Sequence, residues 1–155
     1  MIKNNVRDYT VSAFEFYSIM GKPEDDAFKN RVYRYACSKY ENDPFLSDTQ
    51  KAINIQNLFG LMQPAIADIC AVNEFFKKIT HRPGGAFIKK AVETVYMTNS
   101  KSGFSPGDYS RLVHKAEFAL PASEATVYRY LASAREAFAS IRGLRTPTTI
   151  PDDFK

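Results

Sequence analysis

The sequence predicts an all-α protein. Apolar residues recur at the 3.6-residue spacing of amphipathic helices along most of the chain. Only 7 glycines and 8 prolines occur in 155 residues, too few turn-forming residues for a sheet of many strands. The hydrophobic content of 45% suffices for a buried core, and no apolar run approaches the roughly 18 residues of a membrane span. We therefore expect helices packed into one domain or two very small ones.

Helical segments follow one another through the first half of the chain. The first is expected over about 9–20, where Gly21 stops it. Pro23 starts the second, which should end near Pro44. The third begins after a cap at Ser47 or Asp48, and Pro64 separates it from a fourth helix over 65–80 or kinks one bent helix. The apolar stripe of the first helix comprises Val11, Phe14, Tyr17 and Met20, and that of the second comprises Phe28, Val32, Tyr35 and Tyr40.

A boundary between two subdomains is expected at the helix-breaking segment 81–85. Residues 1–80 hold ten basic and ten acidic residues, whereas the remainder holds eleven and seven, so the net charge of +4 lies in the C-terminal half. We predict an N-terminal helical subdomain over 1–82, for dimerisation or partner contact, a second domain over 83–145 and a tail over 146–155. The basic domain should bind a polyanion.

Three shorter helices are predicted in the basic domain, over 86–97, from Ser105 to Leu120, and from Ser123 to a stop at Gly143. A short turn at Pro121 joins the last two, which is the pattern of a helix-turn-helix. Residues spaced by four, three and four form the buried stripe of the last helix: Val127, Leu131, Ala134 and Phe138.

The outward face of that last helix is expected to enter the major groove of double-stranded DNA. Arg129 suits guanine O6 and N7, and Glu124 can accept from cytosine N4. The predicted base-contacting residues are Glu124, Ala125, Tyr128, Arg129 and Ser133. The predicted phosphate-contacting residues are Lys89, Lys90, Arg111, Lys115, Ser123, Thr126, Arg135 and Arg142.

The segment 123–136, Ser-Glu-Ala-Thr-Val-Tyr-Arg-Tyr-Leu-Ala-Ser-Ala-Arg-Glu, resembles a known class of recognition helix. Its Ser-x-x-Thr-Val core, followed by Leu and an Ala-Arg pair, is similar to sigma-factor region 4 and to phage late-transcription activators of Gram-positive bacteria. The resemblance covers about residues 86–142, and the sequence departs from the usual pattern at Glu117 and Pro121. It implies a tri-helical DNA-binding domain, with a possible RNA polymerase contact.

These features predict a transcriptional regulator encoded by a phage or another mobile element. One recognition helix offers few base contacts, so a homodimer on two half-sites is expected. A protein-interaction adaptor that does not bind DNA and a small DNA-packaging subunit are the alternatives. We expect no enzymatic activity and no cofactor. A metal site is not expected either, because His81, His114, Cys37 and Cys70 are not spaced as metal ligands are. The N-terminus has no signal-peptide core and the cysteines suit a reducing compartment, which predicts a cytoplasmic protein without membrane contact.

Overall fold

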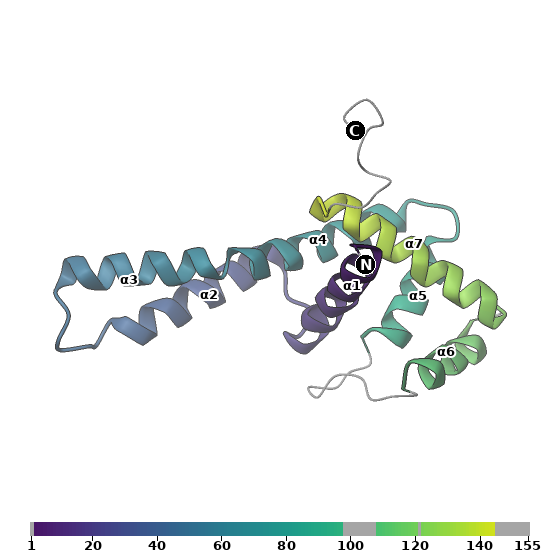
Figure 1. Ribbon diagram of the computed structural model, residues 1–155, viewed down its shortest axis with the longest axis horizontal. Helices are drawn as coiled ribbons and strands as arrows, with labels where there is room; N and C mark the ends of the chain where they lie inside the picture. The colour runs from purple at the N-terminus through teal and green to yellow at the C-terminus, as the bar shows by residue number, and fades with distance from the viewer. Residues whose placement is uncertain (1, 98–107, 121, 145–155) are drawn as a thin grey trace, which may run out of the picture. The chain divides into compact units, whose positions relative to one another are not determined.

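The computed structural model (Figure 1) describes residues 2–97, 108–120 and 122–144. Over these residues all regular secondary structure is helical, which confirms the predicted all-α fold. The predicted helix start at Ser105, the turn residue Pro121 and the tail 146–155 lie outside the described residues. The helices are α1 (Ile2–Ile19), α2 (Asp25–Tyr40), α3 (Asp48–Leu61), α4 (Gln63–Thr80), α5 (Gly85–Val95), α6 (Asp108–Ala119) and α7 (Glu124–Arg142).

The chain divides into two compact units. The larger unit comprises residues 1–22 and 71–155, and the smaller unit comprises residues 23–70. The predicted ranges 1–82 and 83–145 do not coincide with these units, since α1 and the second half of α4 pack with the C-terminal helices. Sixteen basic and ten acidic residues belong to the larger unit, against five and seven in the smaller. The whole positive excess therefore lies in the larger unit.

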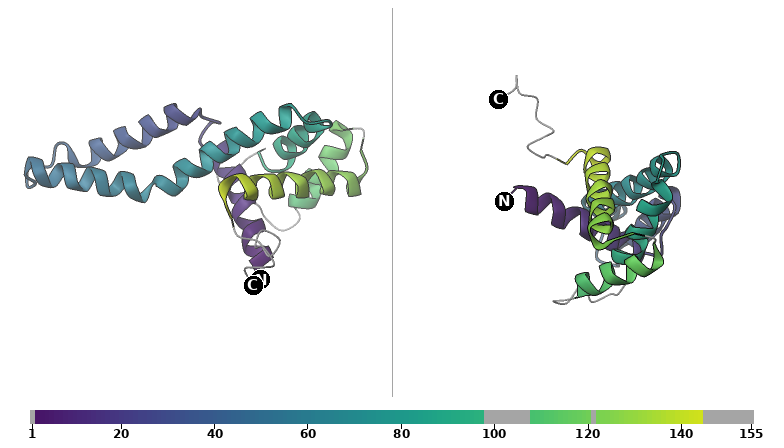
Figure 2. Two further views of the ribbon diagram at one scale, coloured as in Figure 1. Left: turned by 90° about the horizontal axis from the view of Figure 1, so that it is seen from above. Right: turned by 90° about the vertical axis from the view of Figure 1, so that its right-hand side faces the viewer.

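Four aromatic rings form the centre of the larger unit. The ring centroid of Phe14 in α1 lies 5.3 Å from that of Phe75 in α4, 5.8 Å from that of Tyr96 and 5.4 Å from that of Phe138 in α7. None of the four is more than 1% exposed. Figure 2 shows α1 crossing α7, the arrangement that brings Phe14 into this core. Rings packed at these distances add to the free energy of hydrophobic burial.

The buried face of α1 differs from the predicted stripe. It consists of Thr10, Ala13, Phe14 and Tyr17, whereas Val11 is only half-buried and the helix begins at Ile2 instead of near Tyr9. A polar residue is tolerated in this face because the Thr10 hydroxyl donates to the Arg7 carbonyl at 2.8 Å. The predicted stripe rested on apolar residues and therefore did not include Thr10.

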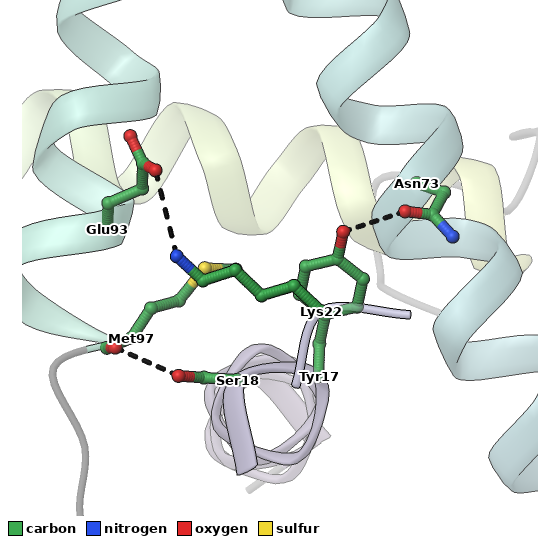
Figure 3. A network of polar contacts seen from close by, with 6 residues as sticks. All are labelled: Tyr17, Ser18, Lys22, Asn73, Glu93 and Met97. Atoms are coloured by element: carbon green, nitrogen blue, oxygen red, sulfur yellow. Dashed lines mark hydrogen bonds and ion pairs between the residues drawn. The ribbon is translucent and has the colours of Figure 1, made fainter. Parts of the chain in front are cut away.

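Two hydrogen bonds attach the C-terminal part of α1 to its neighbours (Figure 3). Tyr17 Oη donates to Asn73 Oδ1 of α4 at 2.8 Å, and Ser18 Oγ donates to the carbonyl of Met97, after α5, at 2.9 Å. Both contacts join residues more than fifty positions apart in the sequence. They hold the C-terminal end of α1 in addition to the packing of Phe14.

The chain leaves α1 through a left-handed turn at Gly21 and Lys22, with φ of 86° and 54°. The turn is closed by Lys22 N, which donates to the Tyr17 carbonyl at 2.9 Å. Gly21 thus stops the helix as predicted. The Lys22 ammonium lies 3.9 Å from Glu93 Oε2 (Figure 3), and because both side chains are partly exposed the pair contributes at most about 1 kcal/mol.

A tight corner joins α4 to α5. Gly84 adopts a left-handed conformation with φ of 74° and Gly85 is buried. A Cβ atom at Gly85 would lie 1.7 Å from the Ile79 carbonyl oxygen, so only glycine fits there. The predicted breaker at 81–85 is confirmed as this corner.

In the smaller unit α2 packs against α3. The buried stripe of α2 is Phe28, Val32 and Ala36, and the Tyr33 ring meets the Phe59 ring of α3 edge-on at 5.9 Å. The prediction that Tyr35 belongs to the stripe is wrong, because Tyr35 is 52% exposed. Steps of four from Phe28 lead through Val32 to Ala36. The prediction chose the large side chain of Tyr35 and overlooked the small one of Ala36.

The predicted interruption between the third and fourth helices is confirmed. Ser47 caps α3 by accepting from Gln50 N at 3.1 Å, and α3 ends one residue before α4 begins. Pro64, the second residue of α4, has no N–H to continue the α3 ladder. Among the described helices none alone has the length and apolar content of a membrane span. Only α3 and α4 taken together, bent by 44°, meet the length and composition of one.

The two cysteines, Cys37 and Cys70, are free thiols, and both are half-buried. Burial and the neighbouring Asp25 carboxylate raise the pKa of the Cys70 thiol.

Candidate nucleic-acid interface

The ends of α7 are set by the residues that the sequence predicted. Ser123 has extended backbone angles and its Oγ accepts from Thr126 N at 3.3 Å, which satisfies one donor of the first turn. Gly143 closes the helix in the left-handed conformation, with φ of 77°. The helix between them spans 19 residues.

α6 lies across the N-terminal end of α7 in every view (Figures 1 and 2). Four residues separate Ala119, the last residue of α6, from Glu124. Leu120 and Ala116 are buried, as is Val127 at the start of α7. The predicted stripe of α7 is confirmed, since none of its members has any exposed surface: Val127, Leu131, Ala134 and Phe138.

The opposite face of α7 is exposed in the larger unit. Ala125, Arg129 and Ser133, at successive steps of four, are all exposed, and so is Glu124. Tyr128 is half-buried, and its ring centroid lies 6.2 Å from that of Tyr109 in α6. The structure thus brings the five predicted base-contacting residues together on one helix, four of them exposed.

Hydrogen bonds connect Arg129 to the first turn of α7. Arg129 Nη2 donates to Thr126 Oγ1 at 3.0 Å, and this hydroxyl lies 3.1 Å from Ser123 Oγ. A guanidinium group has five N–H donors in a rigid fork, so the bond to Thr126 leaves donors that can bind an acceptor outside the protein. Ser123 and Thr126 therefore position Arg129 next to the positive end of the helix dipole.

The predicted phosphate-contacting residues fall into two groups. Lys89 and Lys90 on α5 and Arg111 and Lys115 on α6 are exposed. The Lys89 ammonium lies 5.9 Å from the centroid of the Phe76 ring. These four cations can meet a polyanion at the surface of the larger unit.

Arg135 and Arg142 form the second group, because both are half-buried and bonded within the fold. Arg135 Nη1 donates to Tyr96 Oη at 2.8 Å, and Arg142 Nη2 donates to Tyr9 Oη at 3.5 Å. The sequence analysis missed these bonds, whose partners are 39 and 133 residues away.

A buried tyrosine connects the three C-terminal helices. Tyr96, the C-cap of α5, is 1% exposed, and its Oη lies 2.8 Å from Arg135 Nη1 of α7 and 2.9 Å from Tyr109 Oη of α6. Burial raises the pKa of the Tyr96 phenol strongly and Tyr109 raises it further, while Arg135 offsets part of this. Tyr96 therefore stays protonated, and its hydroxyl holds α6 and α7 in place beneath the exposed face of α7.

One basic feature was missed from the sequence. Residues 75–92 contain no acidic residue, and their basic members include Lys77, Lys78 and Arg82 in addition to the predicted pair on α5. All three are exposed at the end of α4 and in the corner that follows. Lys78 forms an exposed ion pair with Glu74 at 4.0 Å. The absence of negative charge over eighteen residues was the signal that would have found them.

No family model, curated protein or solved structure matches this chain. The described residues contain no group of three or more His, Cys, Asp or Glu side chains placed to hold a metal ion.

Proposed function

We propose that the protein is a DNA-binding transcriptional regulator that places α7 in the major groove of double-stranded DNA. The observation that carries the proposal is the exposed face of α7, on which Thr126 holds Arg129 beside the first turn while α6 lies across the same end of the helix. Two helices separated by only four residues, the second exposed along its outer face, form the arrangement that many DNA-binding proteins use.

Each exposed residue of α7 has a role in this proposal. Arg129 donates to O6 and N7 of a guanine, and Glu124 accepts from N4 of a cytosine. Ala125 packs against a thymine methyl group, since its side chain is small and apolar. Ser133 and the edge of Tyr128 contact the bases or phosphates next along the groove.

The basic residues around α7 bind the phosphate backbone. Lys89, Lys90, Arg111 and Lys115 supply positive charge from α5 and α6, and the uneven distribution of charge between the two units supports this assignment. Ser123 and Thr126 add hydroxyl contacts at the helix N-terminus. Arg135 and Arg142 contribute through the donors that their bonds inside the fold do not use.

The similarity of the segment 123–136 to sigma-factor region 4 and to phage late-transcription activators supports a role in transcription. A phage or mobile-element origin, a possible contact with RNA polymerase and a cytoplasmic location follow from the same proposal. The protein acts as a homodimer, because two recognition helices on half-sites one helical turn apart give the specificity that one cannot.

The test is the affinity of the Arg129→Ala variant for a site selected from a library of random duplexes. We expect binding to weaken by about 5- to 150-fold, equivalent to about 1–3 kcal/mol, and discrimination at one base pair to relax. Lys39→Ala is the matched control, because it removes an exposed positive charge from the smaller unit. Equal affinities of the two variants would show that α7 does not enter the groove, and a protein that selects no site would favour the adaptor.

A further inference from the structure

The smaller unit contains a long stretch without charge. Residues 52–67, which form most of α3 and the start of α4, include no Asp, Glu, Lys or Arg. A helix whose outer face meets water normally has charged residues on that face. Depletion of charge is typical of residues that another molecule covers. We call this stretch the uncharged segment.

α3 does not bury its apolar side chains within the unit. It carries five large ones, and none of them is buried: Ile53, Ile55, Leu58, Phe59 and Leu61. α2 covers one side of the helix, where Tyr33 meets Phe59. On the other side Ile53 is 47% exposed and Leu61 78% exposed. Water therefore meets apolar surface along the part of α3 after Lys51, which has no charged residue to keep it soluble.

The exposed side, which we call the outer face of α3, consists of Ile53, Gln56, Asn57, Gly60 and Leu61. Ile53, Asn57 and Gly60 follow one another at steps of four and three and so share one side of the helix. A Cβ atom placed on Gly60 would have no other atom within 4 Å, which means that the helix backbone is open to approach there. A second helix could therefore pack closely against α3 at Gly60.

We propose that the outer face of α3 binds the same face of a second copy of this chain in a two-fold symmetric dimer. Near a two-fold axis each residue meets its own copy, so any charge there would face a charge of the same sign. The outer face has none. Its polar side chains, Gln56 and Asn57, are amides that both donate and accept hydrogen bonds, so each can pair with a polar group of the other copy whichever sign of partner it meets.

The charges that flank the uncharged segment favour antiparallel pairing. The midpoint of residues 52–67 lies between Phe59 and Gly60, next to the exposed backbone. The first charged residue before the segment is Lys51 and the first after it is Asp68. Antiparallel alignment about the midpoint brings the end bearing Lys51 of each copy to the end bearing Asp68 of the other, which matches opposite charges at both ends.

A lipid bilayer is the less favourable occupant of this face. α2, which packs on α3 in the same unit, exposes Lys29, Arg31 and Arg34. Insertion of the uncharged segment into hydrocarbon would draw these charges toward it, at a cost of several kcal/mol for each one buried. A second protein surface covers the outer face and leaves α2 in water.

The dimer surface rests on observations in the smaller unit and does not depend on DNA binding by α7. Its test is sedimentation equilibrium of the full chain over a range of concentrations. The weight-average mass of the wild type should rise toward twice the 17.5 kDa of the chain. Leu61→Glu, which places charge on the outer face, should stay at the mass of one chain. Circular dichroism should show unchanged helicity, because Leu61 is exposed.

Phe45→Glu is the matched control. Phe45 is 94% exposed between α2 and α3 and lies outside the outer face, so this variant should associate as the wild type does. A wild type that remains monomeric at every concentration overturns the proposal, and so does a dimer that Leu61→Glu leaves intact.

A cross-link tests the position of the axis. Gly60→Cys, in a chain with Cys37→Ala and Cys70→Ala, should form a disulfide-linked dimer on mild oxidation, and Phe45→Cys in the same background should form little. Equal yields would overturn the proposed pairing. Binding of the wild type to phosphatidylcholine vesicles without self-association would place a bilayer on this face instead and also refute the dimer.

Discussion

Replacement of Gly85 by alanine should destabilise the larger unit strongly. The added Cβ would lie 1.7 Å from the Ile79 carbonyl oxygen and 2.8 Å from its carbonyl carbon, about half the usual separation of non-bonded atoms in the first case. The obstructing atoms are backbone, and the Ile79 side chain is 1% exposed, so no flexible group can move aside. Overpacking of a core typically costs 1–3 kcal/mol, and we expect the upper end, about 3 kcal/mol.

The expected change in melting temperature follows from the size of the chain. An unfolding entropy of about 2.1 cal/mol/K per residue gives roughly 0.3 kcal/mol/K, so a loss of about 3 kcal/mol lowers Tm by about 9 °C. Thermal unfolding followed by circular dichroism measures this shift.

Gly84→Ala is the control for the same corner. A Cβ there meets no atom within 4 Å, and only the left-handed φ of 74° opposes the change. This conformation costs alanine about 1–2 kcal/mol, equivalent to about 3–6 °C. If Gly85→Ala lost no more stability than Gly84→Ala, the close approach of Gly85 to Ile79 would be refuted.

Two further predictions concern the core of the larger unit. Phe14→Ala should lower the free energy of unfolding, measured by urea denaturation, by about 3–5 kcal/mol, because it leaves a cavity among three rings. Phe118→Ala is the control, since Phe118 is 93% exposed, and it should change the free energy of unfolding by less than about 0.5 kcal/mol. Similar losses in the two variants would contradict the assigned core. The raised pKa of Tyr96 means that the unfolded chain loses this phenolic proton first, so stability should fall as pH rises above about 10, the pKa of an unfolded tyrosine. Urea unfolding at pH 9, 10 and 11 tests this, and a decline equally steep in Tyr96→Phe would assign the effect to other groups.

The helix of the candidate site was predictable because its signals are local. Val127, Leu131 and Phe138 mark the buried stripe by their spacing, and Ser123 and Gly143 mark its ends by their intrinsic preferences. The residues on the opposite face followed from the stripe. Their DNA contacts stay predictions.

The partners of each helix were not predictable, because they depend on contacts far apart in the sequence. Nothing near Phe14 indicates that its ring packs on Phe138, and the predicted boundary after residue 82 separated the two. Packing instead groups α1 with the C-terminal helices. Local periodicity finds the buried side of a helix but does not identify what covers it.

The same limit applied to single residues of the candidate site. In the sequence Arg135 is one more positive charge within the segment 123–136, and only the fold brings its guanidinium to the hydroxyl of Tyr96. In α1 a satisfied hydroxyl at Thr10 occupies a buried position that the apolar pattern did not include. Polar side chains with partners inside the fold are the ones that sequence patterns misplace.

Binding of the purified protein to random-sequence duplex DNA at increasing salt tests the central claim most directly. The four exposed cations, Lys89, Lys90, Arg111 and Lys115, predict a slope of about −3.6 in the logarithm of the association constant against the logarithm of salt concentration for each bound chain, and contacts from Arg135 and Arg142 would make it steeper. A slope of this size, reduced by about one when Lys115 is replaced by alanine, is the expected result. No binding at low salt, or a slope near zero, would contradict the proposal that this protein binds DNA.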